Sequence, residues 1–172
     1  MRKKPTVADL RAKKGKGRLT MLRLFTLEEA AAAEQAGIDV VSVPSELMTH
    51  PDYRRVAPSL FSMTGVDHRL AGTREGYLRF SGQMLNGGAD AIYCSGSLAT
   101  VRFLADEHIP VVGHVGLVPS RNTWTGGLKR LARRRMRLWR CWPQCRPMRR
   151  QALSRWRLRW CRLRSPPRSA VA

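Results

Sequence analysis

The most informative stretch of the chain spans residues 26–46 and reads TLEEAAAAEQAGIDVVSVPSE. Thr26 can cap a helix with Glu29 reaching back, and the alanine-rich segment that follows stops at Gly37, a residue type common just after helices. Residues 38–43 are then almost continuously apolar, as expected of a strand covered on both faces. This stretch predicts a helix followed by a buried strand of a parallel sheet.

The same alternation extends in both directions and predicts five strands, at residues 19–25, 38–43, 59–63, 89–94 and 109–115. Between them we expect helices over residues 30–36, from Thr73 to about residue 85, and from Ser97 onward. Such repeats form either an open doubly wound sheet or a (β/α)8 TIM barrel. No Gly-x-Gly-x-x-Gly follows the first strand and no Walker lysine loop occurs, which removes the main signal for a nucleotide-binding doubly wound sheet. The expected fold is α/β, a (β/α)8 TIM barrel of which about the first five βα units are present.

The composition changes abruptly after Lys129. Residues 130–172 contain fifteen Arg and neither Asp nor Glu, whereas the first 129 residues have 17 basic and 12 acidic side chains. The net charge of +20 therefore belongs mostly to this tail, which also holds four of the five Trp and three of the four Cys. We expect two parts: the N-terminal portion of a barrel over residues 1–129, and an Arg/Trp-rich tail over residues 130–172.

Reading-frame chemistry offers one explanation of the tail. Ala-Val-Ala codons GCG-GTG-GCG, read one nucleotide later, encode Arg-Trp-Arg, the string found at residues 155–157. On this hypothesis the tail is out of frame and disordered. The alternative is a genuine nucleic-acid-binding segment, in which Arg neutralises phosphates and Trp stacks on bases. Cys141 and Cys145 lack the other ligands of a zinc site and no RNA-binding signature occurs, so we expect no specific nucleic-acid partner.

Features of the first 129 residues suggest a cytoplasmic protein. Cys94 is the one cysteine in this part, which excludes a disulfide framework and suits a reducing compartment. The basic N-terminal residues lack the apolar core of a secretory signal, and no apolar run reaches the length of a membrane span. We therefore expect no membrane partner.

Polar side chains follow the expected strands, where barrel enzymes place their chemistry. Ser45 and Glu46 follow the second strand, Asp67 the third and Ser95 the fourth, while His114 lies at the end of the fifth. Each also has an ordinary structural explanation: a turn or helix cap for the serines and acids, and a hydrogen-bonded core histidine for His114.

The fifth strand carries a specific resemblance. Residues 110–119 read PVVGHVGLVP, and residues 125–129 read TGGLK. This segment resembles the ketopantoate hydroxymethyltransferase family, whose pattern is Pro-Val-x-Gly-His-x-Gly-Leu-x-Pro followed by Gly-Gly-aromatic-Lys. Weaker similarity at residues 7–14, 34–43 and 88–91 extends it over about residues 5–129.

The resemblance implies a (β/α)8 barrel that transfers a hydroxymethyl group from 5,10-methylenetetrahydrofolate to 3-methyl-2-oxobutanoate in pantothenate biosynthesis. It also implies a small oxo-acid partner, assembly into homo-oligomers, and Mg²⁺ polarising the oxo acid. By position in the family's motifs, Asp67 and Glu46 are the expected metal ligands, and Ser45, His114 and Ser95 are expected to bind substrate.

Several positions depart from the family's pattern. Ser45 stands at the Asp of the family's Gly-Asp-Ser-Leu, so that Glu46 could supply a carboxylate only from the adjoining position. Residues 93–96, YCSG, replace Lys-x-Glu-Gly, and the family's base, a Glu after strand six, falls within the tail. The catalytic base is thus unassigned, and we expect the chain to be inactive. A second hypothesis is a phosphoenolpyruvate mutase or isocitrate lyase-like barrel, which applies the same Mg²⁺-enolate chemistry to another oxo acid.

Overall fold

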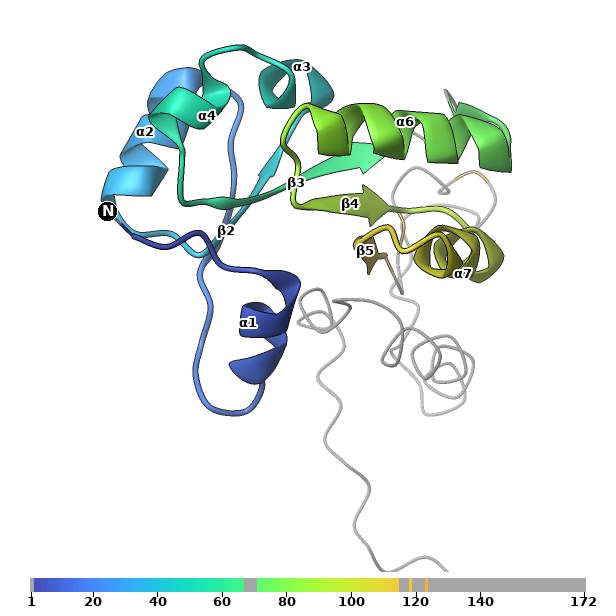
Figure 1. Cartoon of the computed structure of the whole chain (residues 1–172), viewed down its shortest axis with the longest axis horizontal. Helices are drawn as coiled ribbons and strands as arrows, with labels where there is room; N and C mark the ends of the chain where they lie inside the picture. Colours follow the sequence, from blue (N-terminus) through green and yellow to red (C-terminus); the bar gives the residue numbers. More distant parts are fainter. Residues whose placement is uncertain (1, 67–70, 115–117, 119–122, 124–172) are drawn as a thin grey trace, which may run out of the picture.

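The computed structural model describes residues 2–66, 71–114, 118 and 123, and shows strands alternating with helices (Figure 1). The strands are β1 (Met21–Arg23), β2 (Val40–Val43), β3 (Phe61–Val66), β4 (Ala91–Cys94) and β5 (Val111–Gly113). The helices are α1 (Val7–Ala12), α2 (Leu27–Gln35), α3 (Ser45–Met48), α4 (Tyr53–Val56), α6 (Arg74–Asn86) and α7 (Leu98–Asp106).

The described strands form one parallel sheet in the order β1-β2-β3-β4-β5. Each new strand is therefore added on the same side of the previous one. A doubly wound sheet instead reverses direction at a switch point, where its ligand binds, and these five strands contain no such reversal. The predicted α/β class and the predicted number of strands in this part of the chain are confirmed.

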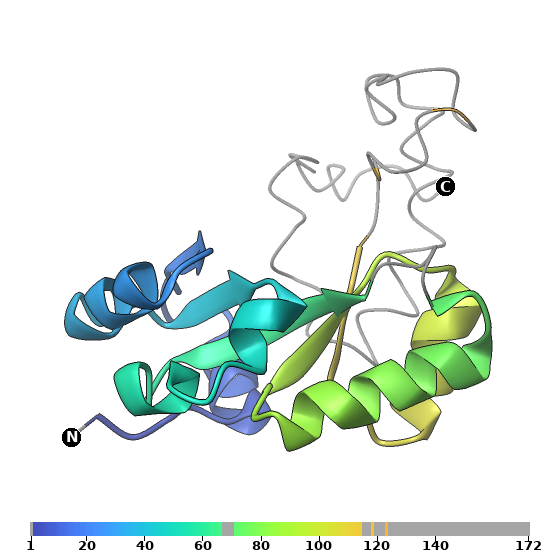
Figure 2. The same ribbon diagram turned by 90° about the horizontal axis from the view of Figure 1, so that it is seen from above.

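The two faces of the sheet are covered differently because successive side chains of a strand point to opposite sides. Helices α2, α4, α6 and α7 pack on what we call the helix face, whose strand side chains include Val41, Ile92 and Val111. Helix α1 covers the opposite face, here the α1 face, by packing Leu10 against a cluster that includes Phe61. Figure 1 shows α1 across the sheet from α2 and α4, and Figure 2 shows α6 and α7 next to each other.

Three predicted helix starts are confirmed. The hydroxyl groups of Thr26, Thr73 and Ser97 accept the backbone N–H of the residue three positions later, which caps α2, α6 and α7. The Glu29 carboxylate reaches back toward the start of α2, as predicted. It accepts the N–H of Phe25, the residue before the Thr26 cap, at 2.7 Å.

Strand boundaries differ from the sequence prediction where other groups take the backbone hydrogen bonds. The first strand begins at Met21 rather than residue 19, since the Thr20 N–H donates to the Asp39 carboxylate at 2.9 Å. The third strand starts two residues later than predicted, because the Ser59 N–H donates to the Glu34 carboxylate at 3.1 Å. It ends three residues later, at Val66, by pairing with β4. The one-turn helices α3 and α4 were not predicted.

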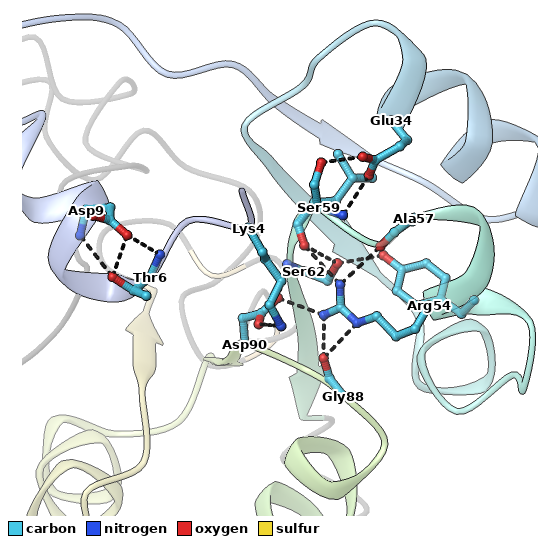
Figure 3. A network of polar contacts seen from close by, with 12 residues as sticks. Lys4, Thr6, Asp9, Glu34, Arg54, Ala57, Ser59, Ser62, Gly88 and Asp90 are labelled. Carbon is cyan, nitrogen blue, oxygen red and sulfur yellow. Dashed lines mark hydrogen bonds and ion pairs between the residues drawn. The ribbon is translucent and has the colours of Figure 1, made fainter. Parts of the chain in front are cut away.

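A polar network fixes the amino end of the sheet (Figure 3). The Arg54 guanidinium donates to the Asp90 carboxylate at 2.7 Å and to the Gly88 carbonyl. Asp90 also accepts the Ser62 N–H at 2.8 Å and pairs with Lys4 at 2.6 Å. Helix α4, strand β3, the turn before β4 and the N-terminal segment are thereby joined through one carboxylate.

Parts of the prediction lie outside the described residues, namely Asp67, the end of the fifth predicted strand at Val115, and the whole tail of residues 130–172. Within the described part of the chain, no helix is both long and apolar enough to cross a bilayer.

Candidate active site

Ser45 and Glu46 lie together immediately after β2, at the first turn of α3. The Ser45 hydroxyl donates to the Glu46 carboxylate at 3.1 Å. Both residues line a cavity of about 560 Å³, which extends from the end of β3 to α6. The structure thus brings together the two site residues that were predicted after the second strand.

The cavity also carries charge from α6. Glu75 and Arg79 both line it. Hydrogen bonds from its own backbone N–H and from the Thr73 hydroxyl lower the pKa of Glu75, so this side chain is a carboxylate at neutral pH. The cavity therefore combines two acidic side chains, Glu46 and Glu75, with one guanidinium.

Tyr93 and His114 form a side-chain pair at the carboxyl ends of β4 and β5. The Tyr93 hydroxyl is hydrogen-bonded to His114 Nδ1, and the two ring centroids are 5.7 Å apart with planes tilted by 40°. The His114 backbone N–H donates to the Cys94 carbonyl at 3.0 Å, which continues the β4–β5 ladder to the histidine. Backbone and side-chain hydrogen bonds together define where the imidazole lies.

Gly65 connects this pair to the cavity. It lines the cavity beside Ser45 and Glu46, and it is the register partner of Tyr93 on the neighbouring strand. A Cβ atom at position 65 would lie 3.3 Å from Tyr93 Cδ1, closer than an ordinary contact. The missing side chain leaves space for the tyrosine ring, so the sequence of β3 permits the position that Tyr93 takes on β4.

Arg23 brings a cation to the carboxyl end of β1. Strand alternation places Arg23 and Ser42 on the α1 face with Met21 and Val40, the same face as Tyr93. Arg23 Nη1 donates to the Ser42 hydroxyl at 3.0 Å, and the guanidinium lies 5.2 Å from the centroid of the Phe25 ring. The side chain is exposed while held by two neighbours, an arrangement suited to binding an anion.

Sequence reasoning did not select Arg23, Ser42 or Tyr93. They lie within the strands, whereas the predicted site residues lie at or after strand ends. The signal that could have found them is the two-residue period, which places Arg23 two positions after Met21 and Tyr93 two positions after Ala91.

The remaining predicted residues are placed less directly. Ser95 is half-buried. Because Cys94 pairs with Gly113, the next residue on each strand places Ser95 opposite His114 at the end of the β4–β5 pair. Asp67 lies outside the described residues, and its predicted metal-binding role stays a prediction.

The described residues fit part of a magnesium site. The Ser45 hydroxyl and the Glu46 carboxylate offer hard oxygen donors on one cavity wall. Mg²⁺ commonly keeps several waters and binds through one or two carboxylates, so this donor set suits it. Among residues 2–66 and 71–114, no group of three His, Cys, Asp or Glu side chains converges on one point.

The chain is similar to a known enzyme family. A sequence model described as ketopantoate hydroxymethyltransferase matches residues 69–149, which include β4, α7 and β5. The 3-methyl-2-oxobutanoate hydroxymethyltransferase of Thermus thermophilus is 33% identical over 152 residues, which are 75% of this chain and 58% of that enzyme. The enzyme of the same name from Nitratidesulfovibrio vulgaris is 30% identical over 148 residues, 72% of this chain and 48% of the relative. The enzyme of the same name from Staphylothermus marinus is 26% identical over 151 residues, which are 74% of this chain and 56% of that enzyme. The chain thus spans about half the length of these relatives.

Proposed function

We propose, from the premise that the chain belongs to the ketopantoate hydroxymethyltransferase family, that its site binds a small 2-oxo acid as the acceptor of a hydroxymethyl group. The observation that carries this proposal is the position of His114. It lies in the segment most specific to the family and at the carboxyl end of β5, beside Tyr93. The family assignment also favours hydroxymethyl transfer over the chemistry of the mutase and lyase-like barrels.

We propose further that the five strands are part of a (β/α)8 barrel. Unidirectional strand order supports this, as does the packing of α2, α4, α6 and α7 on one face. In such a barrel the α1 face is the interior, and α1 closes its amino end. Arg23, Ser42, Tyr93 and His114 then surround the opposite, carboxyl end of the interior.

Each side chain has a proposed task toward the oxo acid. Arg23 binds the carboxylate, because a guanidinium makes charge-assisted hydrogen bonds to that group. His114 donates a hydrogen bond to the oxo oxygen and orients it. Ser45 and Glu46 would hold Mg²⁺, which when bound stabilises the negative charge that develops on the oxo oxygen. The proton on C3 leaves to a general base, and C3 bonds to the methylene carbon of 5,10-methylenetetrahydrofolate, the proposed donor. The bonds from that carbon to the two folate nitrogens break, water supplies the hydroxyl oxygen, and tetrahydrofolate is released.

We expect the chain to bind the oxo acid without converting it. Tyr93 and Ser95 stand where the family has Lys and Glu, and the position of the family's general base falls within residues 130–172. Losing a general base typically lowers a rate by about two to four orders of magnitude. Binding should survive this loss, because the proposed binding groups Arg23 and His114 both precede residue 130.

The test is a calorimetric titration of 3-methyl-2-oxobutanoate into the 172-residue protein, with and without Mg²⁺. His114→Ala should weaken binding in both conditions, whereas Glu46→Ala should weaken it only when Mg²⁺ is present. Glu107→Ala, at the exposed end of α7, is the control and should bind like the unchanged protein. Absence of saturable binding, or equal binding by all variants, would refute the proposed function. Formation of the hydroxymethylated product would refute only the expected inactivity.

A further inference from the structure

The Tyr93–His114 hydrogen bond joins two consecutive strands at the imidazole to which the proposed function gives a substrate-orienting role. Tyr93 belongs to β4, and its hydroxyl meets His114 Nδ1 just after β5. Strand pairing of Cys94 with Gly113 fixes the separation of the two backbones. The contact is therefore set by the sheet itself, and both rings are half-buried.

The chemistry of the two groups gives this hydrogen bond a direction. A phenol hydroxyl, with a pKa of about 10, is a better donor than the N–H of a neutral imidazole, and a bare imidazole nitrogen is a better acceptor than a phenol oxygen. The favoured arrangement has Tyr93 donating to an unprotonated Nδ1. The proton of the neutral imidazole then resides on Nε2, and His114 is a hydrogen-bond donor at that nitrogen.

We propose that Tyr93 is a positioning residue, which fixes His114 in the Nε2-protonated tautomer and so makes it a hydrogen-bond donor toward the substrate oxygen. The role toward the substrate rests on the proposed function, whereas the tautomer does not. Gly65 supports the arrangement, because a Cβ atom at this position would lie 3.3 Å from Tyr93 Cδ1 and crowd the ring.

The tautomer can be measured without any activity. Protonated and unprotonated imidazole nitrogens differ widely in ¹⁵N chemical shift, so NMR of the full chain shows which nitrogen of His114 carries the proton. The chain has four histidines, and a His114→Asn variant assigns the signals. We expect one Nε2-protonated tautomer in the unchanged protein and a mixture of tautomers in Tyr93→Phe.

Tyr53→Phe is the matched control. It also removes a hydroxyl that is hydrogen-bonded, to Ser62 at 2.8 Å, but from a buried tyrosine in the helix-face cluster. It should leave the His114 signals unchanged. Gly65→Ala keeps the Tyr93 hydroxyl but crowds the ring by a few tenths of an ångström, so it should shift the same signals in the same direction by a smaller amount. It serves as a second test if Tyr93→Phe does not fold.

An Nδ1-protonated His114 in the unchanged protein would overturn the proposal. Signals that are identical in Tyr93→Phe would also overturn it. The oxo-acid titration separates this result from the proposed function: if the tautomer responds as expected but no oxo acid binds, the Tyr93–His114 relationship stands and the proposed function fails. If the oxo acid binds, Tyr93→Phe should weaken it about three- to tenfold, the effect of one hydrogen bond.

Discussion

Arg54 and Asp90 form an ion pair of 2.7 Å across 36 residues of sequence, and their side chains are only 25% and 11% exposed. The pair joins α4 to the turn that enters β4 (Figure 3). Because Asp90 also accepts the Ser62 N–H, one carboxylate pairs with Arg54 and Lys4 and accepts a backbone hydrogen bond from β3. A largely buried charge with this many partners is costly to remove.

Asp90→Asn should lower the free energy of unfolding by about 2–3 kcal/mol, because Arg54 and Lys4 lose their counter-ion while the side-chain shape is kept. Urea unfolding at neutral pH measures the change. Asp52→Asn is the control, since its pair with Arg55 is far more exposed and should contribute about 0–1 kcal/mol. Equal destabilisation by both variants would show that the network does not hold the sheet.

Asp39 should make stability depend on pH. Burial raises the pKa of its carboxyl, but hydrogen bonds from the Thr20 N–H and Lys13 outweigh burial and leave the pKa below its ordinary value. A depressed folded-state pKa stabilises the fold above the unfolded value of about 3.9, and the effect is lost as pH falls through the folded value. The stability difference between the unchanged protein and Asp39→Asn should therefore be constant from pH 7 to 5 and shrink below about pH 4. A difference that persists unchanged at pH 3 would contradict this origin.

Local signals in the sequence predicted local structure well, and contacts between distant residues explain what was missed. Thr26, Thr73 and Ser97 were identified as caps because a cap needs only a hydroxyl and the next turn of helix. Helices α3 and α4 contain one turn each, too short for an apolar period to be visible. The lengths of β1 and β3 depend on carboxylates from other segments.

The candidate site likewise combines features that the sequence predicts with features that depend on contacts between distant residues. Ser45 and Glu46 are neighbours in sequence, so their common position after β2 is predictable, whereas the Tyr93–His114 pair depends on the register between β4 and β5. Sequence spacing alone does not give that register. The space that Gly65 leaves for Tyr93 is likewise visible only once β3 and β4 are paired.

Ser97→Ala should destabilise the chain by about 1 kcal/mol, because the N–H of Thr100 loses its hydroxyl acceptor at the start of α7. Ser97→Asp should restore most of the loss, since a carboxylate accepts the same N–H and interacts favourably with the helix dipole. Thermal unfolding of the three proteins tests this. If Ser97→Asp is as unstable as Ser97→Ala, capping is not the function of this side chain.

Arg23→Ala should weaken binding of 3-methyl-2-oxobutanoate by about tenfold or more, because a hydrogen bond to a charged group contributes about 1.5–3 kcal/mol. Arg23→Lys should recover part of the affinity, since it keeps the charge but not the planar fork of donors. Arg55→Ala, an exposed arginine on α4, is the control. If the three variants and the unchanged protein bind 3-methyl-2-oxobutanoate with equal affinity, Arg23 is not the carboxylate-binding residue.

The last prediction concerns the gene. If the tail is out of frame, reading the nucleotide sequence one position over from near codon 129 should restore acidic residues, remove most Arg and Trp, and encode a sixth strand that ends in Glu. The family match extends to residue 149, so codons 129–149 are the region to examine. Restoring the frame should also restore chemistry, because the general base would return beside a site that already holds His114.

Proton exchange at C3 of 3-methyl-2-oxobutanoate in D₂O, followed by NMR, measures that gain. The frame-restored protein should catalyse Mg²⁺-dependent exchange that falls sharply in Asp67→Ala, while the 172-residue chain should not. Frames that contain only stop codons or unpatterned sequence would remove the reading-frame explanation. The Arg/Trp-rich segment would then have to be explained as a genuine part of the protein, with salt-dependent binding to RNA as its first test.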